Sequence, residues 1–159
     1  MFFSKRYAQA AVAFQRAGRK REATICDAYH RREKARSIST AASVDRTRAF
    51  IAVADAFIAC AQGSPSKRVN ERLAYYRNAG ECYLEARDFK NAGHHFEAAE
   101  KYPAAACAYQ EGGYFHEMKV VVTRHRKDLD STFLARSTIP ARIYYFEVRF
   151  DGPAVSEYL

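Results

Sequence analysis

The side chains best suited to chemistry in this sequence are cations gathered near its start. Residues 1 to 48 hold 12 Lys or Arg against 4 Asp or Glu, whereas the remainder carries 14 of each sign, so the net charge of +8 lies in the first third. Guanidinium and ammonium groups bind phosphates and carboxylates through charge-assisted hydrogen bonds. Eight of these cations crowd a predicted helix junction and the end of the next helix: Arg16, Arg19, Lys20, Arg21, Arg31, Arg32, Lys34 and Arg36. We call these eight residues the basic set and treat them as the candidate binding site.

Three interpretations of the basic set stay open. Cations near helix C-termini interact favourably with the helix dipole, so a solvated face needs no ligand. The same cations could bind the phosphates of a nucleic acid or the acidic surface of a protein partner. Residues 1 to 21 also hold six basic residues and no acidic one, as a mitochondrial presequence does. Against a presequence, Ala23 continues the repeat described below, which an excised leader has no reason to share.

Other residue types that carry chemistry do not form a recognisable catalytic or metal site. His94 and His95 are adjacent, and neighbours on a helix point about 100° apart, so they do not converge on one ion. Gly63 to Lys67 lacks the second glycine of the phosphate-binding pattern Gly-x-x-x-x-Gly-Lys-Ser/Thr. Three glutamates are expected on solvated helix faces opposite the aromatic residues: Glu81, Glu85 and Glu97. We therefore expect no catalytic residue, metal, cofactor or small-molecule substrate, and hence no enzyme.

The elements that must position the cations are indicated by a repeat of 13 residues between Tyr83 and Met118. An aromatic, a small residue, a second aromatic and an apolar residue follow one another at intervals of three, and the pattern occurs three times. The aligned sets are Tyr83, Phe96 and Tyr109; Ala86, Ala99 and Gly112; Phe89, Tyr102 and Phe115; and Ala92, Ala105 and Met118. This spacing predicts helices of about 11 residues joined by two-residue turns. Such short helices need stacked neighbours, so we expect all six aromatics to be core anchors packed over the small residues.

Turn chemistry falls in the same part of each repeat unit, between the small residue and the position after the second aromatic. Asp88 is the expected N-cap of one helix, Pro103 suits the first turn of the next, and Gly112-Gly113 is expected to end that helix. The repeat also extends backwards, because Phe14, Ala17 and Ala23 keep the spacing of the first repeat unit. We interpret the N-terminal region as a diverged copy of the same unit.

Apolar spacing predicts the remaining helices. We expect helices over residues 1–17, from 22 to about 36 with Ala23, Cys26 and His30 inside, from about 44 to 62, from 69 to 83, and from 119 to 127. The 44–62 helix should bury Phe50, Ala54, Phe57 and Ala61. Ser131 is expected to cap a last helix that contains Phe133, Leu134, Ile143 and Phe146 and that Pro140 kinks. The predicted fold is all-α, an α-solenoid of about eight short antiparallel helices, with a single domain over 1–150 and a frayed tail over 151–159.

Composition limits the class of protein further. No run approaches the 18 apolar residues of a membrane span, so we expect no membrane insertion. The four cysteines are widely spaced and adjoin apolar helical stripes, which is typical of buried thiols in a reducing compartment. We expect an intracellular protein, cytoplasmic or nuclear.

Two segments carry a resemblance to a known family. The stretches Tyr7-Ala-Gln-Ala-Ala-Val-Ala-Phe-Gln-Arg-Ala-Gly18 and Tyr83-Leu-Glu-Ala-Arg-Asp-Phe-Lys-Asn-Ala92 resemble tetratricopeptide-like helical hairpins. Over residues 1 to 127 they are similar to the repeat region of large fungal proteins related to the TPR and ankyrin repeat-containing protein, which also carry a UvrD-like helicase module. The full 34-residue tetratricopeptide pattern is absent. The resemblance implies a fragment or paralogue of that helical region, without ATPase activity.

The function that these observations favour is a non-catalytic scaffold for protein–protein interaction, with an unknown protein partner. The alternative is a nucleic-acid-associated accessory module that binds phosphates through the basic set. The near-neutral repeat from Tyr83 to Met118 is expected to be structural, so partner contacts are expected in the basic copies before it.

Overall fold

The computed structural model describes residues 2–131, 133 and 134, and this part of the chain is all-helical. In chain order the elements are α1 (Phe2–Arg16), α2 (Lys20–Ser37), α3 (Ser43–Gln62), α4 (Val69–Glu85), α5 (Phe89–Ala98), α6 (Tyr102–Glu111), α7 (Phe115–Arg124) and the 3-10 turn η1 (Arg126–Asp128). The predicted all-α class is confirmed. The expected kink at Pro140, the domain limit at 150 and the tail 151–159 lie outside the described residues.

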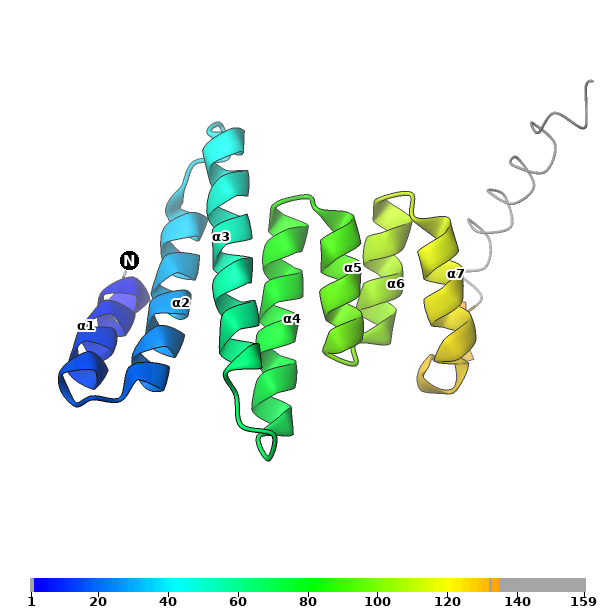
Figure 1. Ribbon diagram of the computed structural model, residues 1–159. Coiled ribbons are helices and arrows are strands. Elements are labelled where there is room, and N and C mark those ends of the chain that lie inside the picture. The colour runs from blue at the N-terminus through cyan, green and yellow to red at the C-terminus, as the bar shows by residue number, and fades with distance from the viewer. Residues whose placement is uncertain (1, 132, 135–159) are drawn as a thin grey trace, which may run out of the picture.

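The helices form one row in chain order, from α1 at one end to α7 at the other (Figure 1). Each helix packs mainly against its neighbours in sequence, and successive helices are antiparallel. The longer helices α1 to α4 form one half of the row, and the short helices α5 to α7 form the other. Side chains of α2 also reach α4 directly: the Asn78 amide donates to the Tyr29 hydroxyl at 3.1 Å and Arg21 pairs with Glu71 at 2.8 Å. Side chains from three successive helices therefore meet on one face of the row.

One backbone motif joins four of the helix pairs. A residue with left-handed backbone follows each first helix: Gly18, Arg87, Glu100 and Gly113, with φ of 73°, 59°, 57° and 77°. After α4, the N–H of Asp88 donates to the carbonyl of Tyr83 at 2.9 Å and the N–H of Arg87 donates to that of Leu84 at 2.9 Å. Equivalent bonds close the other three joints, so each is a Schellman motif. The joint after α1 therefore repeats the others, as the diverged copy predicts.

The lengths of helix and connector within the 13-residue repeat differ from the prediction. Helices α5, α6 and α7 each have 10 residues. Three-residue connectors complete the period of 13, instead of 11 helical residues with a two-residue turn, because the Schellman motif needs a C-cap, a left-handed residue and the next N-cap.

The predicted caps are confirmed within the repeat. The carboxylate of Asp88 accepts the backbone N–H of Asn91 at 3.2 Å, Pro103 lies in the first turn of α6, and Gly112 caps that helix. The prediction for Ser131 is wrong by one residue. Asp130 accepts the N–H of Phe133 at 2.6 Å while Ser131 is already helical, because an equally good capping residue stands one position earlier.

The core of the repeat is built from rings seated on glycines. Tyr83, Phe96 and Tyr109 are buried as predicted, together with Ala92, Ala105 and Met118. A Cβ added to Gly80 would lie 2.9 Å from the Phe96 ring, and one on Gly93 would lie 2.5 Å from the Tyr109 ring. The two glycines are themselves one repeat apart. The small residues expected beneath the rings, Ala86, Ala99 and Gly112, instead cap the ends of α4, α5 and α6, because a ring reaches the body of the preceding antiparallel helix.

The second aromatic set is not part of the buried core. Phe89, Tyr102 and Phe115 are the first residues of α5, α6 and α7, and all three are only half-buried. The expectation that all six aromatics anchor the core is therefore wrong for this set. A residue at the start of a helix lies at the edge of the row, where fewer neighbours cover it.

The long helices are joined by a ladder of rings. Tyr7 stacks on Tyr29 at 5.3 Å between centroids, Tyr29 meets the edge of Phe57 at 5.1 Å, and Phe57 stacks on Tyr75 at 6.4 Å, so the ladder crosses α1 to α4. The predicted stripe of α3 is buried. The predicted inner face of α2 is wrong. Its buried residues are Ala28 and Ala35, which lie two turns apart on one face, whereas Ala23, Cys26 and His30 are half-buried.

The left-handed joints give a first prediction. Replacing Gly113 by Ala should lower the free energy of unfolding by about 1 kcal/mol, because a Cβ is disfavoured at positive φ. Glu100→Gly, at the same phase one unit earlier, removes such a Cβ and should be neutral or slightly stabilising. Urea unfolding of both variants checks the pair. Equal losses in the two would show that the joints do not depend on left-handed backbone.

Candidate functional site

The structure divides the basic set between the two ends of α2. Arg16, Arg19, Lys20 and Arg21 lie at the α1–α2 joint, whereas Arg31, Arg32, Lys34 and Arg36 lie in the last turns of α2. A helix of this length spans about 27 Å at 1.5 Å per residue. The eight cations therefore form two groups and not one continuous patch.

Most of the basic set is already paired with carboxylates. The pairs are Arg19 with Glu22 at 2.7 Å, Arg21 with Glu71 at 2.8 Å, Arg31 with Asp27 at 2.7 Å, and Arg32 and Arg36 with Glu33 at 3.8 and 3.0 Å. Arg16, Lys20 and Lys34 are exposed and have no ion pair with the described residues. Arg32 and Arg36 differ from the other pairs because they share one carboxylate.

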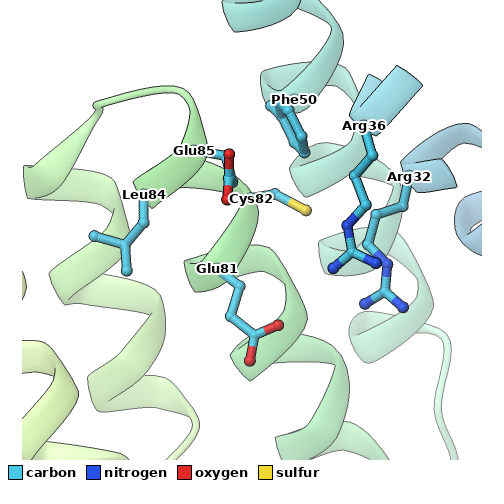
Figure 2. A pocket seen from close by; sticks show the side chains of 7 residues that line it. All are labelled: Arg32, Arg36, Phe50, Glu81, Cys82, Leu84 and Glu85. Carbon is cyan, nitrogen blue, oxygen red and sulfur yellow. The ribbon is translucent and has the colours of Figure 1, made fainter. Parts of the chain in front are cut away.

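Arg32 and Arg36 line a cleft between α2 and α4, which we call the α2–α4 cleft. It has a volume of about 240 Å³ and is lined by Arg32, Arg36, Phe50, Glu81, Cys82, Leu84 and Glu85. Each wall carries two like-charged residues four positions apart, which places both on one helix face. Figure 2 shows the two guanidinium groups side by side on the α2 wall and the carboxylate of Glu81 across the opening.

The guanidinium of Arg32 is held in place by aromatic rings but lacks hydrogen-bond acceptors within the described part of the chain. The side chain is only 16% exposed, and its guanidinium carbon lies 4.9 Å from the ring centre of Tyr29 and 5.6 Å from that of Phe57. Its Nε is buried without a hydrogen-bond partner, since the contact with Glu33 at 3.8 Å is too long for one. Two ring faces therefore orient a cation that has no hydrogen-bonded acceptor among the described residues.

Arg46 fixes the two walls of the cleft relative to each other. Its guanidinium donates to Glu85 at 2.9 Å and to the carbonyl of Ile38 at 3.0 Å, and it lies over the ring of Phe50 at 4.9 Å. It thus joins the end of α2, α3 and the end of α4. Sequence reasoning missed this role, because Arg46 stands among exposed residues at the start of α3.

A second hollow continues the α2–α4 cleft. Its volume is about 510 Å³, and it shares Leu84 and Glu85 with the cleft. The rest of its lining comes from the α2–α3 connector, the start of α3 and the α4–α5 joint: Thr40, Ser43, Arg46, Thr47 and Arg87. Together the two hollows form an open groove on the surface and not an enclosed cavity.

Arg21 has a structural role at the opposite end of α2. Glu71 accepts the hydroxyl of Tyr75 at 2.8 Å and pairs with Arg21 at 2.8 Å, which ties α2 to α4 across the end of α3. Burial raises the pKa of Glu71, but the hydrogen bonds from Tyr75, Arg21 and Arg68 outweigh it and hold the pKa below its usual value. This member of the basic set is engaged inside the fold.

Buried tyrosines recur as donors to carboxylates. Tyr83 donates to Asp55 at 3.0 Å and Tyr109 to Glu97 at 2.7 Å. Burial, followed by the bond to Asp55, raises the pKa of Tyr83 to about 12. The expectation that Glu97 is a solvated residue opposite the aromatics is wrong, because the ring of the next helix reaches it.

The cysteines are not in disulfides, but they differ in burial. Cys60 and Cys82 are buried, Cys26 is half-buried and Cys107 is exposed, so the expectation of buried thiols fails for Cys107. Burial raises the pKa of Cys82, in the α2–α4 cleft, to about 12. Its thiol therefore stays protonated near neutral pH and is not a nucleophile there.

The histidines form no metal site within the described residues, where no group of three His, Cys, Asp or Glu side chains could hold an ion. The rings of His94 and His95 stand at 90° with centroids 5.2 Å apart. His95 instead stacks on Tyr83 at 5.1 Å and donates Nδ1–H to the carbonyl of Asn91 at 2.8 Å. Burial between α4 and α5 lowers the pKa of His95 below its usual value.

His95 predicts a pH dependence of stability. Because its pKa is depressed in the folded chain, the unfolded chain takes up the proton first as the pH falls below about 6.5, and stability falls with it. His95→Gln should flatten the decline in unfolding free energy between about pH 7 and 5. His94→Gln removes only a smaller cause of the lowered pKa of His95, the repulsion from His94, so most of the decline should remain. Identical pH profiles for the wild type and His95→Gln would contradict the assignment.

Comparison with protein-family models, curated proteins and solved structures gives no significant match. The tetratricopeptide-like resemblance thus rests on the residues quoted above. Among the described residues, no helix combines the length and the apolar character that crossing a bilayer requires.

Proposed function

We propose that this chain is a non-catalytic scaffold that binds a segment of another protein, in the cytoplasm or nucleus. The observation that carries the proposal is the α2–α4 cleft, which residues from three successive helices line on the surface of a regular row. Surfaces of this kind are the usual binding sites of helical-repeat proteins. The resemblance to fungal helicase-associated proteins further suggests a fragment or paralogue of their repeat region.

The nucleic-acid alternative draws its support from the three members of the basic set that are exposed and have no ion pair with the described residues, Arg16, Lys20 and Lys34. These three are divided between the two ends of α2, so they offer scattered phosphate contacts. Such binding would be weak and would fall steeply with salt.

Affinity capture of the full-length gene product, with and without nuclease, separates the two proposals. We expect a protein partner that stays bound after nuclease treatment. A partner released by nuclease would support the nucleic-acid module instead, and the absence of any protein partner would contradict the scaffold.

A further inference from the structure

We propose that the α2–α4 cleft recognises an acidic side chain, Asp or Glu, within an extended and otherwise neutral or basic segment of the protein partner. This inference rests on the proposed scaffold function and deepens it. The acidic side chain would lie against the guanidinium groups of Arg32 and Arg36, which Figure 2 shows side by side at the opening.

The arginines of the α2 wall have too few acceptors within the described part of the fold. Two arginines share the single carboxylate of Glu33, and Arg32 receives no hydrogen-bonded acceptor from the described residues. A guanidinium gains most from a carboxylate held in its plane, where two parallel hydrogen bonds can form. The rings of Tyr29 and Phe57 already orient Arg32, so binding would cost little side-chain entropy.

The charges around the cleft also favour an acidic ligand. Glu85 is neutralised by Arg46 at 2.9 Å, and Glu81 is paired with Arg77 at 3.7 Å. The lining itself holds two arginines and two glutamates. When their ion partners Arg46, Arg77 and Glu33 are included, four arginines stand against three glutamates, so one positive charge remains uncompensated. One added carboxylate would therefore balance the charge around the cleft.

The α4 wall decides between an acidic peptide and a nucleic acid. Glu81 and Glu85 stand across the opening from the arginines, and Glu85 is 53% exposed. A continuous chain of phosphates would also lie against Glu81, whose ion pair with Arg77 is long at 3.7 Å and half exposed, and would be repelled there. A peptide can instead present one acid to Arg32 and Arg36 and a neutral or basic residue to Glu81.

A labelled peptide that repeats Glu-Ser-Lys-Ser tests the proposal by fluorescence anisotropy at low salt. We expect saturable binding, weakened about tenfold or more by Arg36→Gln, which removes one of the two donors. Arg31→Gln is the matched control, because Arg31 is an exposed α2 arginine paired with Asp27 outside the cleft. It should leave the affinity unchanged. Arg36 is 53% exposed, so its variant should fold, and circular dichroism checks this.

Two outcomes overturn the inference. Equal affinities for the wild type and Arg36→Gln would place the peptide elsewhere. Tighter binding of single-stranded DNA than of the peptide, lost in the same variant, would assign the cleft to phosphates. A protein partner captured after nuclease would in either case leave the scaffold function standing, so the two proposals fail separately.

Discussion

Replacing Phe96 by Ala should lower the free energy of unfolding by about 3 to 5 kcal/mol, the usual loss for a buried phenylalanine. The ring is 4% exposed and lies in the gap above Gly80, where an added Cβ would approach it to 2.9 Å. Truncation would therefore leave a cavity between α4 and α5 that neither helix can close without shifting. Because domains of this size have only about 5 to 15 kcal/mol of stability, the variant should be strongly destabilised.

Urea unfolding followed by circular dichroism measures this loss. His94→Ala serves as the control from the same helix, since His94 is exposed and the change should stay within about 0.5 kcal/mol. A loss below about 1 kcal/mol for Phe96→Ala would remove Phe96 from the core and with it the ring-on-glycine contact.

Gly93→Val should cost about 2 to 3 kcal/mol, at the upper part of the range for overpacked sites. A Cβ at this position would lie 2.5 to 2.7 Å from three atoms of the Tyr109 ring. That ring cannot move aside freely, because its hydroxyl donates to Glu97 at 2.7 Å and the side chain is buried. The loss should exceed the gain of a few tenths of a kcal/mol in helix propensity on replacing glycine.

A double-mutant cycle separates the steric effect from other causes. In a Tyr109→Leu background the ring is gone, so Gly93→Val should cost at least about 1 kcal/mol less than in the wild type. Ala98→Val, at an exposed position of the same helix, controls for the β-branched side chain. Additive losses across the cycle would mean that Gly93 and Tyr109 are not in contact.

The helices and joints could be predicted because their signals are local. The recurrence of residue types every 13 positions fixed the phase at which Asp88, Pro103 and Gly113 act. The contacts between helices depend on more than spacing. The aromatic positions indicated which rings are buried, but Gly80 and Gly93 fall outside the repeated set, so their role beneath the rings appeared only in three dimensions.

The cleft was less accessible to sequence reasoning than the fold. Arg32 and Arg36, and likewise Glu81 and Glu85, are visibly four residues apart, so each pair shares a helix face. Whether these two faces meet depends on how α2 and α4 pack around α3, which residue spacing within a helix does not indicate. Charge counting also treated the basic set as one candidate site, whereas carboxylates on α2 and α4, including Glu71, engage several of its members. The net charge predicts that a ligand would be anionic. The positions of the carboxylates decide which cations remain available to bind it.

The most direct test of the account locates the bound peptide on the folded chain. Titrating the Glu-Ser-Lys-Ser peptide into ¹⁵N-labelled protein and following backbone amide shifts reports each helix separately. We predict that the shifts concentrate in the last turns of α2, at Phe50 and along residues 81–85 of α4, the elements that line the α2–α4 cleft. Shifts confined to the α1–α2 joint, around Arg16, Arg19 and Lys20, would contradict the account and return the binding site to the exposed cations.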